Sequence, residues 1–109
     1  MDRGSGTGVA LNLQRASGFV VERCLFLENV AEAASGAGIR TGGSSGEIRF
    51  NVFAYDSCYA STSDGAGIRA EASTTTVFNN TFVGCYSVVN GSAFAGVFGG
   101  TTVFRNNAV

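Results

Sequence analysis

The 109-residue sequence contains no histidine, no lysine, no proline and no tryptophan. Without histidine the chain cannot form the Ser–His or Cys–His pairs of nucleophilic enzymes, or a zinc site ligated by histidine. Without lysine it cannot form the lysine-containing phosphate-binding loop. Catalysis would therefore have to depend on Asp, Glu, Arg, Tyr or Cys side chains, or on a metal held by carboxylates.

Charged residues are also few, at 14% of the chain, whereas hydrophobic residues make up 45%. This balance is typical of a folded domain rather than of a disordered segment. The net charge of −1 does not indicate binding to nucleic acid or to an anionic membrane. No apolar run is long enough to span a membrane, and residues Met1 to Ser5 do not resemble the start of a signal peptide.

The three cysteines are Cys24, Cys58 and Cys85. An odd and sparse set is not typical of a disulfide framework, so we interpret them as free thiols that act as small hydrophobic residues. A Cys58–Cys85 bridge between neighbouring repeats is the alternative. Free cysteines favour a cytoplasmic location. Cys58 and Cys85 have no cationic neighbour in sequence that would favour a reactive thiolate.

An internal repeat dominates what the chain does contain. The residues from Gly36 to Arg40 read Gly-Ala-Gly-Ile-Arg, and the same five letters recur from Gly65 to Arg69, 29 residues later. Related positions extend the series to four steps, anchored on Gly8, Gly38, Gly67 and Gly96. Because side chains of a strand alternate between its two faces, we expect Val9, Ile39, Ile68 and Val97 to point inward and Ala10, Arg40, Arg69 and Phe98 to point outward.

A second strand follows each of these segments, and its copies begin at Val21, Ile48, Val77 and Val103. The sixth position of the copies holds Phe26, Phe53, Phe82 and Ala108. The fourth position, which we expect to turn inward at a corner, holds Cys24, Asn51, Asn80 and Asn106. Just after the strand, Asn29, Asp56 and Cys85 are aligned in another column.

This pattern resembles the right-handed parallel β-helix of the pectate-lyase-like superfamily. The resemblance implies that Asn51, Asn80 and Asn106 stack as an asparagine ladder, from which Cys24 departs. We therefore expect an all-β fold, a right-handed parallel β-helix of about four coils of 29–30 residues, in a single domain covering residues 1–109. The coils would start near Gly8, Gly38, Gly67 and Gly96, and each would bury its apolar edge against its neighbours.

Arg40 and Arg69 are predicted to stack as like charges on adjacent coils. Glu71 shares their face of the strand and Asp64 lies in the preceding turn, so either could neutralise them. The group is interpreted either as a structural ion cluster or as a site for an anion or acidic sugar. The second interpretation draws partly on the resemblance, because many members of the superfamily bind or cleave acidic polysaccharides.

The acids are too scattered for the paired carboxylates of a glycoside hydrolase, and one aspartate, Asp56, is too few for a calcium site. We therefore predict no catalytic residue, no metal and no cofactor.

A four-coil solenoid has two open ends, and unpaired strand edges promote association unless they are covered. The chain is expected to be either a piece of a longer β-helix or a homo-oligomer whose copies cover each other's ends or sides. An outward apolar and aromatic surface favours self-association, and the predicted interface residues are Phe50, Val52, Phe78, Phe98 and Phe104. Two functional hypotheses follow, a non-enzymatic self-associating scaffold or binding module, and a protein that binds or acts on acidic glycans.

Overall fold

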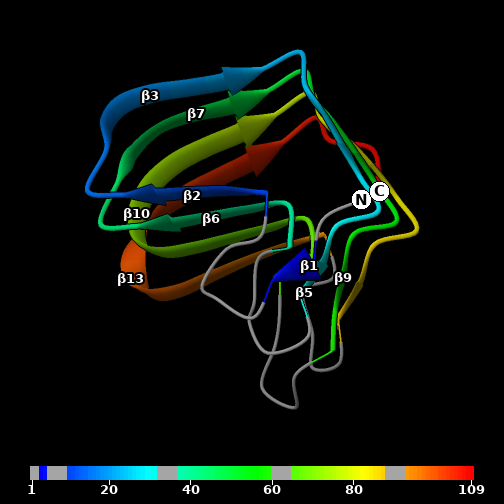
Figure 1. The fold of residues 1–109 in the computed structure, drawn as a ribbon. Coiled ribbons are helices and arrows are strands. Elements are labelled where there is room, and N and C mark those ends of the chain that lie inside the picture. The colour runs from blue at the N-terminus through cyan, green and yellow to red at the C-terminus, as the bar shows by residue number, and fades with distance from the viewer. Residues whose placement is uncertain (1–2, 5–9, 32–36, 60–64, 88–92) are drawn as a thin grey trace.

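The computed structural model describes residues 3–4, 10–31, 37–59, 65–87 and 93–109. These residues form an all-β structure in which every strand pair is parallel. We refer to residues 10–31, 37–59, 65–87 and 93–109 as levels 1 to 4, because each level lies beside the next one along the chain (Figure 1). Among the described residues no helix could cross a membrane.

The strands form three sheets, which we call A, B and C. Sheet A contains β1 (Arg3–Gly4), β5 (Val30–Ala31), β9 (Ser57–Cys58) and β12 (Tyr86–Ser87). Sheet B contains β2 (Leu11–Gln14), β3 (Ser17–Glu22), β6 (Ile39–Gly42), β7 (Ser45–Arg49), β10 (Ile68–Phe78) and β13 (Phe94–Arg105). Sheet C contains β4 (Leu25–Leu27), β8 (Val52–Ala54) and β11 (Thr81–Val83).

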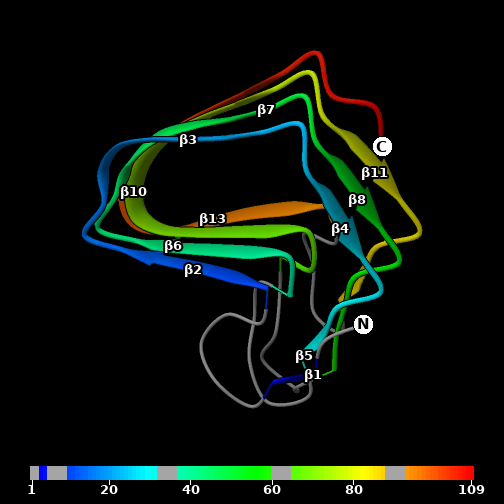
Figure 2. The same cartoon turned by 45° about the horizontal axis from the view of Figure 1, so that its top comes forward.

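Sheet B is strongly curled, as Figure 2 shows. The single strand β10 pairs first with β6 and then with β7, so one strand covers both halves of the sheet. The bend falls at Ala72, which has a positive φ of 47°. The sheet therefore folds back over its own inner face, where the apolar side chains gather.

The core is built from columns of inward side chains in register between levels. Ile39 pairs with Leu11 on one side and with Ile68 on the other, and Ile68 pairs in turn with Phe94. A second column contains Val21, Ile48, Val77 and Phe104. In a third column, the rings of Phe26, Phe53 and Phe82 stack with centroids 4.7 and 4.8 Å apart. Offset aromatic stacking of this kind adds to the free energy of apolar burial.

The predicted register is wrong in level 4. The partner of Ile68 is Phe94 rather than Val97, which pairs instead with Glu71. Arg69 accordingly lies beside Ala95, and Phe98 falls in the irregular segment opposite Ala72, with its side chain outside the described residues.

The register is also wrong at the start of level 1, where the partner of Ile39 is Leu11. Gly8 and Val9 lie outside the described residues. Gly38 and Gly67 therefore occupy equivalent positions in levels 2 and 3. In level 4 the equivalent residue is Ala93, whose carbonyl accepts the Ile68 N–H.

Close packing explains the two central glycines. A Cβ on Gly38 would lie 2.5 Å from the Gly67 carbonyl oxygen and 3.0 Å from the Phe53 ring. A Cβ on Gly67 would lie 2.6 Å from the Ala93 carbonyl oxygen and 2.9 Å from the Phe82 ring. The repeated glycine thus lets the backbone of one level approach both the next level and the aromatic stack.

Levels 1 to 3 each turn at three corners, and a residue with positive φ occupies each of these turns and the second corner of level 4. The first corner uses Arg15, Gly43 and Ala72, the second Arg23, Phe50, Asn79 and Asn106, and the third Glu28, Tyr55 and Gly84. A single left-handed residue redirects the strand without continuing into a helix. At most of these positions the next residue carries a small polar side chain or a cysteine, namely Ser44 and Ser73, then Cys24, Asn51, Asn80 and Asn107, and then Asn29, Asp56 and Cys85.

Candidate functional site

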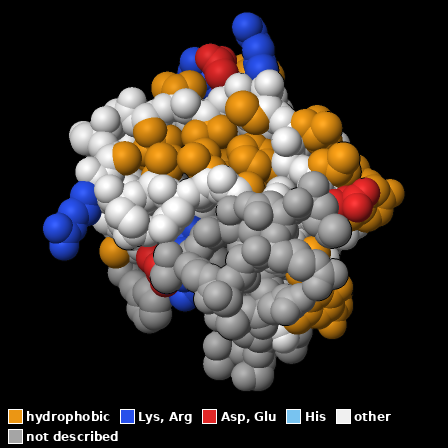
Figure 3. All heavy atoms as spheres, in the orientation of Figure 1, with side chains coloured by type: hydrophobic (Ala, Val, Ile, Leu, Met, Phe, Trp, Pro, Cys, Tyr) orange, Lys and Arg blue, Asp and Glu red, His pale blue; other side chains and the backbone are white. Residues whose placement is uncertain are grey.

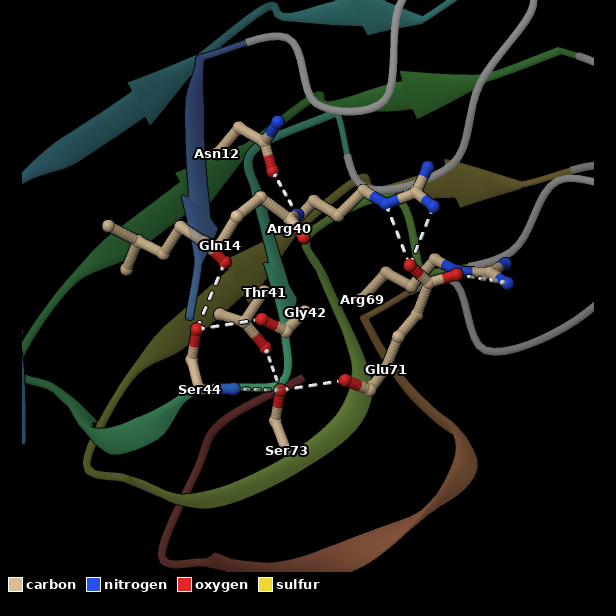
Figure 4. Close-up of polar contacts among 10 residues, drawn as sticks. Asn12, Gln14, Arg40, Thr41, Gly42, Ser44, Arg69, Glu71 and Ser73 are labelled. Carbon is tan, nitrogen blue, oxygen red and sulfur yellow. Dashed lines mark hydrogen bonds and ion pairs between the residues drawn. The ribbon is translucent and has the colours of Figure 1, made fainter. Parts of the chain in front are cut away.

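Arg40, Arg69 and Glu71 form an ion cluster on the outer surface of sheet B (Figure 4). Arg40 on β6 and Arg69 on β10 are in register, as the sequence predicts for like charges on adjacent strands. Glu71 follows two residues after Arg69 and lies on the same face. Asp64, the other predicted member, lies outside the described residues.

Both carboxylate oxygens of Glu71 accept hydrogen bonds from arginine. Arg40 donates from Nε and Nη2 to Oε2 at 3.0 and 2.6 Å. Arg69 donates from Nε to Oε1 at 3.1 Å, and its Nη2 lies 3.0 Å from the same oxygen. The side chains are only 18%, 12% and 16% exposed for Arg40, Arg69 and Glu71. The Glu71 carboxylate therefore pairs with both guanidinium groups, and Arg40, Arg69 and Glu71 together carry a formal charge of +1.

A chain of hydroxyl groups lies beside the cluster at the first corner (Figure 4). Thr41 Oγ1 donates to Ser73 Oγ at 3.0 Å, the Ser44 N–H donates to the same oxygen at 3.2 Å, and Ser73 Oγ donates to the Glu71 carbonyl at 2.8 Å. Thr41, Ser44 and Ser73 are all buried. Buried polar groups are stabilising only when they are hydrogen-bonded, so this chain fixes the backbone that carries Glu71. The sequence analysis did not identify it.

The asparagine column lies at the second corner. Asn51 donates from its backbone N–H and from Nδ2 to Asn80 Oδ1, at 2.9 and 3.0 Å. Asn80 donates in the same way to Asn107 Oδ1, at 2.9 and 3.1 Å. The Cys24 N–H donates to Asn51 Oδ1 at 3.0 Å, so Cys24 begins the column without adding an amide.

The prediction for Asn106 is wrong by one residue. Asn106 is exposed and has a positive φ of 51°, and the residue in the column is Asn107. The same shift changes Phe104, which was predicted to point outward but pairs with Val77 and packs on Phe82 and Phe94. Phe104 is 41% exposed because the described structure places no further level on its outer side.

The column of Asn29, Asp56 and Cys85 forms the third corner, in the order expected from the sequence. Asn29 donates from its backbone N–H and from Nδ2 to Asp56 Oδ1, at 3.0 and 2.9 Å. Asp56 is fully buried, and its Oδ2 has no hydrogen-bond partner within the described structure. Burial raises the pKa of Asp56 to about 6, against the lowering effect of the Asn29 hydrogen bonds.

Cys24, Cys58 and Cys85 form no disulfide in the described structure, in agreement with their interpretation as thiols. Cys24 is exposed, Cys58 is fully buried and Cys85 is partly buried. Burial raises the pKa of Cys85 to about 11, which opposes a nucleophilic thiolate at neutral pH. Among the residues that the structure describes, no group of three or more Cys, Asp or Glu side chains is arranged to hold a metal ion.

The outer face of sheet C is apolar. In register across its three strands lie Leu25, Val52 and Thr81, and then Leu27, Ala54 and Val83. Leu25, Leu27, Val52 and Val83 are 61%, 43%, 40% and 42% exposed. No charged side chain belongs to this set of six, and five of the six are apolar.

The predicted interface residues do not share one surface. Val52 lies within the outer face of sheet C, and Phe50, 51% exposed, lies at the corner that precedes β8. Phe78 is half-buried between the Phe50 ring, 6.0 Å away, and the Arg105 guanidinium group, 5.3 Å from its centroid. Phe104 belongs to the inner column. The sequence analysis did not identify Leu27 and Val83, which lie in register on either side of Ala54.

Comparison of the chain with family models, with curated proteins and with solved structures finds no match.

Proposed function

We propose that this protein is a non-enzymatic scaffold with the architecture of a right-handed parallel β-helix, and that it associates with further copies of itself. Levels 1 to 4 correspond to successive coils in this proposal, which is supported by parallel pairing of each level with the next. The resemblance to the pectate-lyase-like superfamily supports the same architecture through the corner asparagines and the glycine-aliphatic segments.

The observation that carries the proposal is the apolar outer face of sheet C. Four of its six side chains are large, aliphatic and 40–61% exposed. Contiguous apolar patches on monomeric proteins are usually small, and larger ones mark interaction sites. A sheet face of this kind packs well on an equivalent sheet face, as the two layers of a β-sandwich do.

An enzymatic role has less support from the described side chains. Glu71 is already bound by two arginines, Asp56 is fully buried, and the Cys85 thiol has a raised pKa. The glycan-binding alternative depends on Arg40 and Arg69, whose hydrogen bonds to Glu71 leave a surplus charge of only +1.

The solution mass tests the proposal. We expect light scattering to give a mass of at least twice the 11.2 kDa of one chain, and Val52→Asp to lower it. Thr74→Asp is the matched control because Thr74 is also exposed on an outer strand surface, but on sheet B. A mass of one chain for the unmodified protein over a wide concentration range would refute self-association.

A further inference from the structure

The two ends of sheet B expose unpaired strand edges within the described structure. Among the described residues, strands β2 and β3 pair only with β6 and β7, and β13 pairs only with β10. Side chains of level 1, including Leu11, Leu13 and Phe19, pack on the core from one side and are only partly buried. Figure 3 shows hydrophobic atoms at the surface between the positions that β2 and β3 occupy in Figure 1.

The exposed ends belong to the same columns. At level 4 the inward residues Phe94 and Phe104 lie beyond Ile68 and Val77, and at level 1 the equivalent residues are Leu11 and Val21. Level 1 of a second copy would therefore offer level 4 the same kind of apolar row that each level offers its neighbour.

The sheets are also offset in a complementary way. Sheet A includes β1 beyond level 1, but on the opposite side its described strands end at β12 in level 3. Sheet B, in contrast, extends to β13 in level 4. When β2 and β3 of a second copy lie beside β13, its β1 reaches the free edge of β12, and sheets A and B each continue with four strand rows per copy.

Charge follows the same register. One outward column contains Glu22, Arg49, Phe78 and Arg105. Within it, Nη2 of Arg49 lies 3.3 Å from Oε1 of Glu22. Arg105 is exposed at the level 4 end and Glu22 lies at the level 1 end. Continuation of the column places Arg105 of one copy beside Glu22 of the next, with opposite charges.

In the asparagine column, the hydrogen bonds from backbone N–H groups to side-chain oxygens run in one direction, from level 1 towards level 4. Each corner N–H donates to the side-chain oxygen one level further on, and Asn107 is the last acceptor in the described structure. In a continued stack the Asn107 N–H would meet Cys24 of the next copy. Sulfur is a weak acceptor, so this step is weaker than the internal ones but not repulsive, and the exposed Cys24 thiol becomes covered.

We propose that a second copy of this chain is the partner of these ends, stacked head-to-tail with its level 1 on level 4 of the first. The inference rests on the proposed β-helix stacking but uses a different surface from the outer face of sheet C. The chain extends 29, 24 and 20 Å along its principal axes. A face spanned by the two longer axes measures on the order of 500 Å², and two faces bury about 1,000 Å², the lower range of specific interfaces. Because the two faces differ, the contact is heterologous and continues into open stacks.

Charge reversal tests the contact. Arg105→Glu places two acidic side chains in the proposed pair, and we expect it to weaken concentration-dependent growth in light scattering by about tenfold. Adding Glu22→Arg to the same chain restores opposite charges across the contact and should recover growth in part, because the substitution also removes the internal Glu22–Arg49 pair. Thr74→Asp, on level 3, changes the net charge away from both ends and should leave growth unchanged.

A thiol measurement on the unmodified protein does not depend on how the variants fold. Alkylation of Cys24, followed by mass spectrometry, should slow as the protein concentration rises, whereas Cys58 stays unreactive because it is buried. A monomer at all concentrations, or Cys24 alkylation that does not change with concentration, overturns the stacking. An association that Val52→Asp abolishes and Arg105→Glu leaves intact also overturns it, but supports self-association through sheet C.

Discussion

Replacement of Asp56 by asparagine is expected to stabilise the protein at neutral pH. In the second corner, the amide nitrogens of Asn51 and Asn80 donate to the carbonyls of Val21 and Ile48, both at 2.9 Å. Asp56 occupies the corresponding place in the third corner, but an ionised carboxylate has no hydrogen to donate, and its buried Oδ2 has no partner in the described structure. An amide nitrogen at this place could donate in the same way as those of the second corner.

The magnitude follows from the pKa of Asp56, which burial raises from 3.8 to about 6. A shift of about two pH units corresponds to about 3 kcal/mol of folding free energy. The pKa of Asp56 is higher in the folded than in the unfolded state. The contribution of its protonated carboxyl to the free energy of unfolding is therefore fully present below pH 3.8 and is lost as the pH rises from there through about 6. The Cys85 thiol, with a pKa raised to about 11, stays neutral in this range.

Urea unfolding of both proteins between about pH 4 and about pH 8 measures the effect. The advantage of Asp56→Asn over the unmodified protein should rise with pH and level off at up to about 3 kcal/mol. Subtracting the two curves removes the contribution of the other carboxylates. Asn51→Asp is the converse control, since it places a carboxylate in a buried amide column and should lose stability as the pH rises. A pH-independent difference, or an Asp56→Asn protein that is less stable at the alkaline end, would refute the argument.

Two further predictions concern the ion cluster and the central glycines. Glu71→Gln removes the carboxylate that two registered guanidinium groups share and should cost about 2 kcal/mol of stability, partly recovered by salt, because the cluster is mostly but not fully buried. Equal urea midpoints for the two proteins at low salt would contradict it. Gly67→Ala should lose about 1–3 kcal/mol in thermal unfolding because its Cβ meets the Ala93 carbonyl and the Phe82 ring. Gly96→Ala, whose Cβ would find its nearest neighbour at 3.3 Å, serves as the control with a smaller loss, and equal losses would contradict the packing argument.

The sequence alone was sufficient for the all-β class and for the central levels. The identical segments around Ile39 and Ile68 lie in register, and the second strands around Ile48 and Val77 do as well. In these two levels the residue types repeat because the same contacts repeat. Each level has a glycine against an aromatic ring and an asparagine at its second corner. The Arg40, Arg69 and Glu71 cluster could be predicted for the same reason, since strand register and side-chain alternation determine which charges meet.

The errors near the second corner of level 4 lie where two neighbouring residues compete for one position. In level 4, Val103 or Phe104 could point inward, and Asn106 or Asn107 could accept the corner hydrogen bond. Alignment of the repeats predicts Val103 and Asn106 in these roles, whereas in the structure Phe104 lies in the inner column and Asn107 accepts the hydrogen bond. The choice depends on an irregularity earlier in β13, where Gly99 and Gly100 both have positive φ. A change of one residue in a strand exchanges its two faces, and no local pattern near Val103 reports it.

A common hydrogen-bond geometry links the three corners. The Ser44, Asn51 and Asn29 N–H groups each donate to a side-chain oxygen one level further on, from Ser73, Asn80 and Asp56 respectively. The geometry requires an acceptor at every step, which serine, asparagine and aspartate all provide, so residue identity can vary while the fold is maintained. It also requires the remaining hydrogen-bonding group of each side chain, a hydroxyl or amide hydrogen or a second carboxylate oxygen, to have its own partner. Serine and asparagine achieve this by donating to nearby carbonyls, whereas ionised aspartate cannot. The third corner is therefore the least satisfied of the three, and the pH dependence of folding should originate there.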